Sequence, residues 1–246
     1  MLSATTSNKL YEMKLSIMAQ AFGEQMSNSS LSELSFEDRF GLLVDAEWAA
    51  RKSNRLTRLI RNAEYAIAEA CIEDVEYSPD RKLDKAQIAR LSTCEYIPKH
   101  HNIILLGASG AGKTYLACAF GQSANRNFFS VKYVRLPDLL AELAIARGDG
   151  SYRKLMKQYK NVNLLILDEW LLYPLKESEA RDLLEIAEAR HGHGSIIFCS
   201  QFDVPGWHIK IGEPTLADAI CDRIVHNSYT IKIEGDSMRR HNGIND

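Results

Sequence analysis

Several familiar features are missing from this sequence, and each absence narrows what the protein can be. No apolar run approaches the roughly 18 residues of a membrane-spanning helix, and the N-terminus has no apolar segment of the signal-peptide kind. The five cysteines are scattered without a Cys-x-x-Cys pair, which argues against zinc ligands and disulfides. These absences predict a soluble, cytoplasmic protein with reduced thiols.

A strong charge of either sign is also missing. The 246 residues carry 30 basic and 32 acidic side chains, so the net charge is −2, and any binding to nucleic acid must come from local patches. His191-Gly-His193 is a lone histidine pair, which we interpret as a loop at a helix end. With 46% hydrophobic and 25% charged residues, the composition is that of a globular protein with one α/β domain and a smaller one.

The hydrophobic pattern changes twice along the chain and predicts three regions. Residues 1–75 have helical spacing without strand alternation, residues 76–101 read as a linker with one short helix, and residues 102–246 alternate between strands and helices. We therefore expect a small all-α N-terminal domain followed by a linker and an α/β domain.

Five short segments in the third region read as strands, and helical segments separate them; three are apolar, and 128–136 and 229–233 alternate at least in part. They cover residues 102–106, 128–136, 163–167, 195–199 and 229–233. Strands that are joined by helical crossovers form a parallel sheet with helices on both faces. The sequence thus predicts a doubly wound, five-stranded parallel α/β fold.

The stretch Gly-Ala-Ser-Gly-Ala-Gly-Lys-Thr, between the first strand and a helical segment, fits the phosphate-loop pattern at every fixed position. Its glycines allow backbone N–H groups to turn inward around a phosphate, and the next helix adds the positive end of its dipole. Lys113 can reach the β- and γ-phosphates, and the Thr114 hydroxyl can ligate Mg²⁺. We predict that ATP binds to Gly107, Ala108, Ser109, Gly110, Ala111, Gly112, Lys113, Thr114 and Tyr115.

Two adjacent carboxylates, Asp168 and Glu169, follow the apolar segment 164–167, about 55 residues after Lys113. In phosphate-loop enzymes an acid at such a strand end holds Mg²⁺, and we predict this role for Asp168. Glu169 is suited to orient or deprotonate the attacking water. Paired acids can also merely terminate a strand, but the phosphate loop upstream favours the catalytic interpretation.

Two further polar positions have open alternatives. Ser200-Gln201 ends the next apolar strand, where a side chain could hydrogen-bond the γ-phosphate or the water, although a simple exit from strand to loop fits equally well. Arg223 lies in a helix predicted over residues 215–227 and could act on the γ-phosphate of a neighbouring subunit. A surface salt bridge is the alternative for this arginine.

A basic stripe lies on a long helix that we predict from about Phe36 to Ile72, after a capping-box pattern at Ser35 and Asp38. The stripe consists of Arg51, Lys52, Arg55, Arg58 and Arg61. Several of these share one helical face, which could track a phosphate backbone or could be a solvated face. A second basic patch, on a helix predicted over residues 151–160, consists of Arg153, Lys154, Lys157 and Lys160.

Together these motifs resemble a known family. The phosphate loop, the strand ending in Asp168-Glu169-Trp170, the segment Pro-Thr-Leu-Ala-Asp-Ala-Ile-Cys-Asp-Arg-Ile at 214–224 and Gly235-Asp-Ser-Met-Arg239 look like those of the IstB/DnaC-like AAA+ ATPases. The likeness is greatest to the IstB helpers of bacterial insertion-sequence transposases, and it covers nearly the whole chain.

The resemblance implies roles for individual residues. Ser200-Gln201 matches the sensor 1 position, although the family often has asparagine where this chain has Gln201. Arg223 matches the arginine finger that acts in trans, and Arg239 matches a sensor 2 position. The family also implies Mg²⁺-dependent, DNA-stimulated ATP hydrolysis by a homo-oligomer on duplex DNA. It further implies a separate transposase as partner, to which the protein supplies target DNA and which it stimulates.

Two other functions remain open from the sequence. A replicative-helicase loader of the DnaC kind shares the ATPase core and would carry a helicase-docking element in residues 1–75. A small-molecule kinase would use the same phosphate loop, but it would need a substrate pocket with a lid and would not need an arginine in trans.

Overall fold

The computed structural model describes residues 2–235, apart from the side chains of residues 2–4, 29 and 32. The described chain forms two compact units, and the division in the sequence lies between Arg58 and Leu59. No helix of the described residues is long and apolar enough to span a membrane. All five cysteines are free, and four of them are buried.

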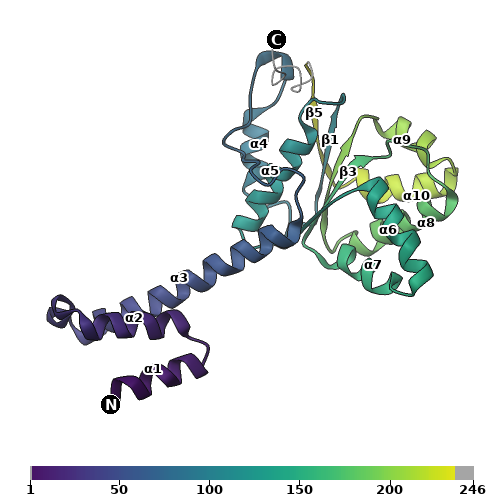
Figure 1. Cartoon of the computed structure of the whole chain (residues 1–246). Helices are drawn as coiled ribbons and strands as arrows, with labels where there is room; N and C mark the ends of the chain where they lie inside the picture. The colour runs from purple at the N-terminus through teal and green to yellow at the C-terminus, as the bar shows by residue number, and fades with distance from the viewer. Residues whose placement is uncertain (1, 236–246) are drawn as a thin grey trace, which may run out of the picture. The chain divides into compact units, whose positions relative to one another are not determined.

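The N-terminal unit is helical, as its pattern predicts. It contains α1 (Leu2–Glu12), α2 (Ser16–Ser27), the short 3-10 helix η1 (Ser29–Glu33) and most of α3 (Phe36–Ala63) (Figure 1). The predicted cap of α3 is present, because the Asp38 N–H donates to Ser35 Oγ at 3.1 Å. The buried Glu47 of α3 accepts hydrogen bonds from the N–H groups of Ile17 and Met18, at 3.1 and 3.0 Å. One carboxylate therefore ties the start of α2 to α3.

Helix α3 is shorter than the sequence predicts, because it ends at Ala63 rather than near Ile72. Glu64 has a left-handed backbone conformation, with φ of +55°, and interrupts the helix. The chain then packs as an irregular segment against the second unit's core, where the Tyr65 hydroxyl donates to Asn125 Oδ1 at 2.8 Å. The apolar residues after position 63 therefore make core contacts without continuing the helix.

The C-terminal unit contains the predicted five-stranded parallel sheet, in the strand order β2-β3-β4-β1-β5 (Figure 1). The strands are β1 (Asn102–Gly107), β2 (Val131–Arg135), β3 (Leu164–Trp170), β4 (Ser195–Ser200) and β5 (Ser228–Ile233). Before the sheet come η2 (Pro79–Arg81) and α4 (Lys85–Ser92). The other helices are α5 (Lys113–Arg126), α6 (Leu136–Asp149), α7 (Tyr152–Asn161), α8 (Glu177–Arg190), α9 (Val204–Ile211) and α10 (Pro214–Val225).

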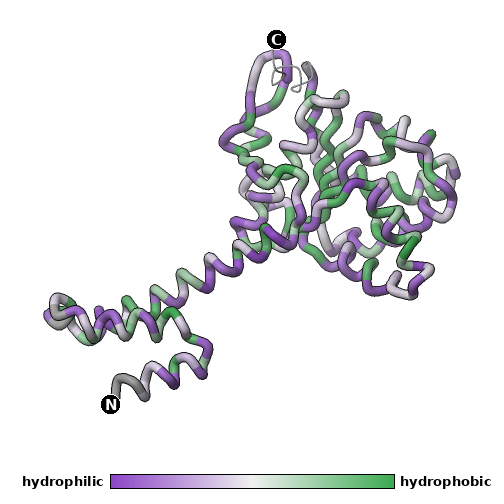
Figure 2. The backbone as a smooth tube through the Cα atoms, in the orientation of Figure 1, coloured by the Kyte–Doolittle hydropathy of each residue, from purple (hydrophilic) through white to green (hydrophobic). Residues whose placement is uncertain are grey.

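Helices cover both faces of the sheet and enclose two separate cores, and the strands between them are strongly apolar (Figures 1 and 2). Alternate residues of a strand point to opposite faces. Accordingly, Ile103 and Leu105 of β1 belong to the core under α4 and α5, whereas Ile104 belongs to the core under α6 to α10. Burial on both faces explains why the inner strands β1, β3 and β4 lack a polar alternation, whereas the edge strands β2 and β5 carry exposed polar residues.

Helix α9 was not predicted. Its N-terminus is capped by Asp203, whose Oδ1 accepts from the Gly206 N–H at 3.1 Å. Its Trp207 is fully buried, with a ring centroid 5.8 Å from that of Trp170. Tertiary burial of one aromatic side chain thus stabilises a helix of 8 residues that contains both proline and glycine.

Candidate functional site

The phosphate loop joins the carboxyl end of β1 to the amino end of α5, as the sequence predicts. Gly110 and Gly112 have φ of +79° and +94°, a region that residues with side chains rarely adopt. A Cβ atom at Gly107 would lie 2.5 Å from the carbonyl oxygen of Ile233 in β5. Backbone conformation and close packing therefore require glycine at these positions.

Lys113, the first residue of α5, is 9% exposed and lies inside this loop. Its Nζ donates to the carbonyl oxygens of Gly107 and Ala108, each at 2.8 Å. Burial lowers the pKa of Lys113, while Cys199 and Asp168 oppose the shift. No carboxylate of the described residues forms an ion pair with this ammonium group, so its charge is available to a phosphate.

Asp168 connects three elements at the carboxyl edge of the sheet. Its Oδ2 accepts hydrogen bonds from Thr114 Oγ1 at 2.7 Å and from the Tyr133 hydroxyl at 2.8 Å. Burial, and then the Asp168 charge, raise the pKa of Tyr133, so the phenol remains a donor. Thr114 and Asp168 supply adjacent oxygen ligands, which fits Mg²⁺, since this ion takes few protein ligands beside substrate phosphates and water.

Glu169 lies beside Asp168, and its side chain is 32% exposed. Its Oε2 accepts from Arg135 Nη2 at 2.8 Å, at the end of β2. The backbone of Glu169 is left-handed, with φ of +54°, a conformation that costs about 1–3 kcal/mol and persists where the surroundings impose it. Arg135, which the sequence did not reveal, therefore holds the predicted base Glu169 at the carboxyl edge of the sheet.

The two residues at the end of β4 differ in role. Ser200 is 1% exposed, and its Oγ donates to the carbonyl oxygen of Phe202 at 2.9 Å and accepts from Trp207 Nε1 at 3.0 Å. These contacts make Ser200 part of the packing around α9. Gln201 is exposed just beyond the strand, so it is the residue of this pair that remains a candidate for sensor 1.

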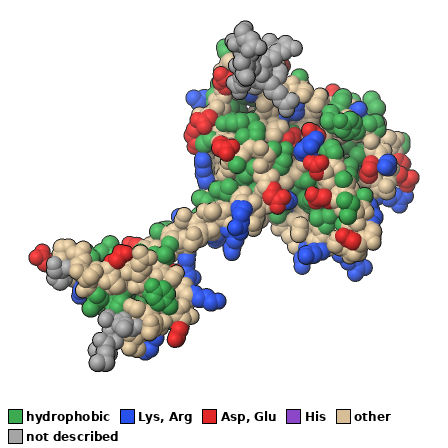
Figure 3. Space-filling model, viewed as in Figure 1, with side chains coloured by type: hydrophobic (Ala, Val, Ile, Leu, Met, Phe, Trp, Pro, Cys, Tyr) green, Lys and Arg blue, Asp and Glu red, His purple; other side chains and the backbone are tan. Residues whose placement is uncertain are grey.

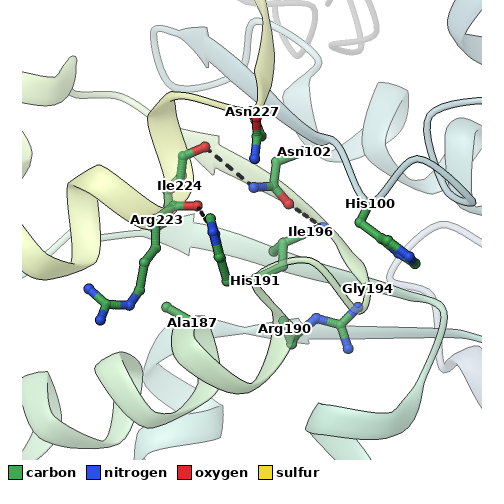
Figure 4. Close-up of a pocket in the computed structure, with 10 residues that line it drawn as sticks. All are labelled: His100, Asn102, Ala187, Arg190, His191, Gly194, Ile196, Arg223, Ile224 and Asn227. Atoms are coloured by element: carbon green, nitrogen blue, oxygen red, sulfur yellow. Dashed lines mark hydrogen bonds between the residues drawn. The ribbon is translucent and has the colours of Figure 1, made fainter.

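Arg223 lies far from the phosphate loop of its own chain. The next residue, Ile224, accepts a hydrogen bond from Asn102 at the first position of β1, about 17 Å from the carboxyl end of that strand (Figure 4). The guanidinium pairs with Glu188 at 2.9 Å and donates to Ala219 O at 2.8 Å. Both predicted alternatives thus remain, because a salt bridge is present and the side chain is still 31% exposed.

The two basic patches differ in how their charges are used. Arg51 pairs with Glu47 at 2.7 Å and donates to Lys14 O at 2.7 Å, so it holds the helices of the N-terminal unit together. Lys160 pairs with Glu185 at 2.7 Å. The Lys52 ammonium lies 4.7 Å from the centroid of the Trp48 ring. The other predicted members are exposed: Arg55, Arg58, Arg61, Arg153, Lys154 and Lys157.

A groove in the C-terminal unit brings the end of α3 together with α7. It is lined by Leu59 and Asn62 from α3, by Lys154 and Lys157 from α7, and by the start of β2. Arg61 is the neighbour of Asn62 on α3, and Lys and Arg side chains lie along the edge of the C-terminal unit over α7 (Figure 3). The end of α3 and two lysines of the second basic patch, about 90 residues apart in the sequence, therefore border one groove at the amino edge of the sheet.

Tyr133 and Arg135 are site residues that the sequence analysis missed. They occupy alternate positions near the end of β2, and their only sequence signal is polarity at the end of a predicted strand.

Arg239, the predicted sensor 2 residue, lies outside the described residues. The His191 ring contacts the carbonyl oxygen of Arg223 at 3.3 Å, at the end of α8, where the histidine pair was placed.

Comparison with known proteins identifies the family of this chain. The family described as IstB-like ATP binding protein matches residues 8–245. The insertion sequence ATP-binding protein y4pL of Sinorhizobium fredii is 46% identical over 241 residues, which are 98% of either chain. The ATP-binding protein of insertion sequence IS1162 from Pseudomonas fluorescens is 42% identical, over 82% of this chain and 87% of that one.

Solved structures share the fold at low identity. The AMPPCP-bound DnaA from Aquifex aeolicus has a TM-score of 0.58 at 19% identity, over 72% of this chain and 54% of that one. The DnaC helicase loader has a TM-score of 0.57 at 16% identity, over 67% of this chain and 97% of that one. These similarities establish the architecture of the α/β unit.

Proposed function

Because the chain belongs to the IstB-like ATP-binding protein family, we propose that it is an oligomeric, DNA-binding ATPase that delivers target DNA to a partner transposase and stimulates it. The observation that carries this proposal is the presence of two sites on one sheet. The phosphate loop, Asp168 and Glu169 meet at the carboxyl edge, and Lys154 and Lys157 line a groove at the amino edge.

The nucleotide site supports hydrolysis of ATP. Lys113 and the N–H groups of the loop would bind the phosphates, and Glu169 would orient or deprotonate the attacking water. Thr114 and Asp168 would hold Mg²⁺, which neutralises charge on the phosphates when it is bound. Gln201, which follows the neighbouring β4, would contact the γ-phosphate or the water.

The groove supports DNA binding without sequence readout. Lys154, Lys157 and Arg61 have no ion-pair partner among the described residues, so their charges can neutralise phosphates. Contacts to the backbone give affinity and no sequence specificity. One subunit would offer few such contacts, and an oligomer would present them repeatedly along a duplex. ATP-driven assembly would therefore strengthen DNA binding.

The names of the related proteins support a transposase as partner, since they are ATP-binding proteins of insertion sequences. Family membership leaves the small-molecule kinase without support. A helicase loader shares the architecture of the ATPase unit, so the fold does not separate it from a transposase helper. Co-purification with a transposase rather than with a replicative helicase would separate the two.

The proposal can be tested by measuring DNA affinity against salt concentration in the presence of an ATP analogue. We expect that replacing Arg55, Arg58 and Arg61 by alanine flattens the salt dependence by about 2–3 in the log–log slope, at roughly 0.9 per lost phosphate contact. The Lys154→Ala/Lys157→Ala variant should flatten it by slightly less than 2. Unrelated duplexes should be affected equally.

A matched control replaces Lys99 and Lys176, which are also exposed lysines but do not line the groove. Its slope should equal that of the wild type. Unchanged slopes in both the arginine variant on α3 and the lysine variant on α7 would contradict the proposed DNA site. ATP turnover that does not respond to duplex DNA would contradict the proposed coupling.

A further inference from the structure

Arg81 is a buried cation beside the phosphate loop. It lies in η2, within the stretch that the sequence analysis treated as a linker, and it is only 7% exposed. Its Nη1 donates to Glu76 O at 2.8 Å, and its Nη2 donates to Ala111 O at 3.0 Å. A Cβ atom on Gly112 would lie 2.8 Å from Nη2. The guanidinium therefore rests directly on the turn of the loop.

The charge of Arg81 is not neutralised by a carboxylate. No acidic side chain of the described residues forms an ion pair with it, and its hydrogen-bond acceptors are two backbone carbonyl groups. Burial of a charged group is unfavourable unless a partner compensates it. The two carbonyl dipoles offset only part of the cost of burying the Arg81 charge. An anion bound in the adjacent loop would offset more of it.

The contact with Ala111 also orients a peptide group of the loop. In a trans peptide the C=O and the following N–H point in opposite directions. Because the Ala111 carbonyl points to Arg81, the Gly112 N–H points away from it. This N–H has no acceptor among the described residues, so it is available to a ligand. Arg81 thus fixes the direction of one of the N–H groups that form the loop.

Arg81 and Lys82 also contact the residue that follows β5. The Glu234 N–H donates to Arg81 O at 3.2 Å, and Lys82 pairs with Glu234 at 2.6 Å. Gly107, the first residue of the loop, packs against Ile233. The loop is therefore contacted on one side by the linker and on another by the residues that end the sheet.

From these contacts we propose that Arg81 is a positioning residue of the nucleotide site. It holds the Ala111–Gly112 peptide so that its N–H faces the bound phosphates, and it adds positive charge behind the loop. It acts on both ATP and ADP through the loop, and it takes no part in the attack of water. Its loss therefore raises KM and leaves kcat nearly unchanged.

The test compares Arg81→Met and Arg81→Lys by steady-state ATPase kinetics, by binding of a fluorescent ADP analogue, and by thermal melting without nucleotide. We expect Arg81→Met to raise KM and the ADP Kd about tenfold, which is ~1.4 kcal/mol. The value of kcat should change less than about threefold, and Arg81→Lys should recover most of the affinity because it keeps the charge. Arg90→Met is the matched control, because Arg90 lies in the same region but is exposed over the Tyr229 ring.

If Arg81 only stabilised the fold, its loss would lower the melting temperature and the active fraction without changing KM. A folded Arg81→Met protein with unchanged KM and ADP affinity would therefore overturn the proposal. If this variant does not fold, Arg81→Gln replaces it and removes the charge, and Arg81→Ala is measured beside it because alanine removes both the charge and the N–H donors. An unchanged KM in the folded glutamine variant would overturn the proposal equally.

Discussion

The two ends of the central sheet both bury a basic side chain next to backbone carbonyl groups, but with different consequences. At the amino end, Arg190 is 1% exposed and donates to carbonyl oxygens at 2.7 to 3.2 Å. The acceptors are Tyr159, Lys160, Val162, Asn163 and Ser195. At the carboxyl end, Lys113 donates to the carbonyl oxygens of Gly107 and Ala108 and lies in the phosphate loop at the start of α5.

The direction of the helices explains this difference. In a parallel α/β fold, helices begin at the carboxyl end of the sheet and offer N–H groups, which bind anions. They end at the amino end and leave carbonyl groups without partners, which bind cations. Arg190 accordingly satisfies the end of α7, whereas Lys113 stands where a phosphate binds. A buried cation therefore indicates a ligand site only where helix N-termini surround it.

Arg223 lies at the amino end of the sheet, since its neighbour Ile224 contacts the first residue of β1. From there it cannot reach a nucleotide in the phosphate loop of its own chain. We therefore expect Arg223→Ala to lower kcat about 1,000-fold, as for a lost arginine finger, and to leave ATP affinity unchanged. Rates of ATP hydrolysis and a direct binding assay would measure the two quantities.

Mixing Arg223→Ala with Lys113→Ala tests action in trans. Mixed oligomers contain an intact phosphate loop beside a neighbour with an intact Arg223, so part of the activity should return. Absence of rescue together with loss of ATP binding would show that Arg223 acts only within its own chain.

Glu169 is the predicted base at the carboxyl end. Glutamine keeps its shape but cannot take a proton, so Glu169→Gln should hydrolyse ATP at least ~100-fold more slowly and still bind it. The variant should remain on DNA as an ATP-bound oligomer. Single-turnover hydrolysis measures the effect, and near-normal turnover would assign the proton transfer to another group.

Lys113→Ala removes the buried ammonium group that lies inside the phosphate loop. We expect ATP affinity to fall about 100-fold, because charge-assisted contacts to the phosphates are lost, and nucleotide-dependent assembly to disappear with it. Equilibrium binding and light scattering would measure both. Retained tight binding would refute the role of Lys113.

Arg190→Met tests the buried cation at the amino end of the sheet. Several buried carbonyl groups lose their donor, so we expect the free energy of unfolding to fall by ~2 kcal/mol, while KM of the folded protein stays unchanged. Urea unfolding measures the first quantity. Arg181→Met is the control, because this exposed arginine pairs only with Glu177 and should contribute less than about 0.5 kcal/mol. An altered KM for Arg190→Met would break the separation between the two ends.

Sequence reasoning succeeded where the signal was local. The phosphate loop is a contiguous pattern, and Asp168 meets Thr114 because two parallel strands end at the same edge of the sheet. It failed for the end of α3, because apolar residues after Ala63 have helical spacing but are buried by tertiary contacts. The spacing of apolar residues does not reveal which neighbour they pack against.

The sequence by itself determined the five strands, most of the helices between them, the phosphate loop and the two adjacent acids. These features depend on residue type and spacing within short segments. Only the tertiary structure decided that Tyr133 and Arg135 contact the two acids, that Ser200 serves packing, and that the ends of α3 and α7 border one groove. Such contacts join residues that are far apart in the chain, and they are selected by burial and hydrogen bonding once the sheet has formed.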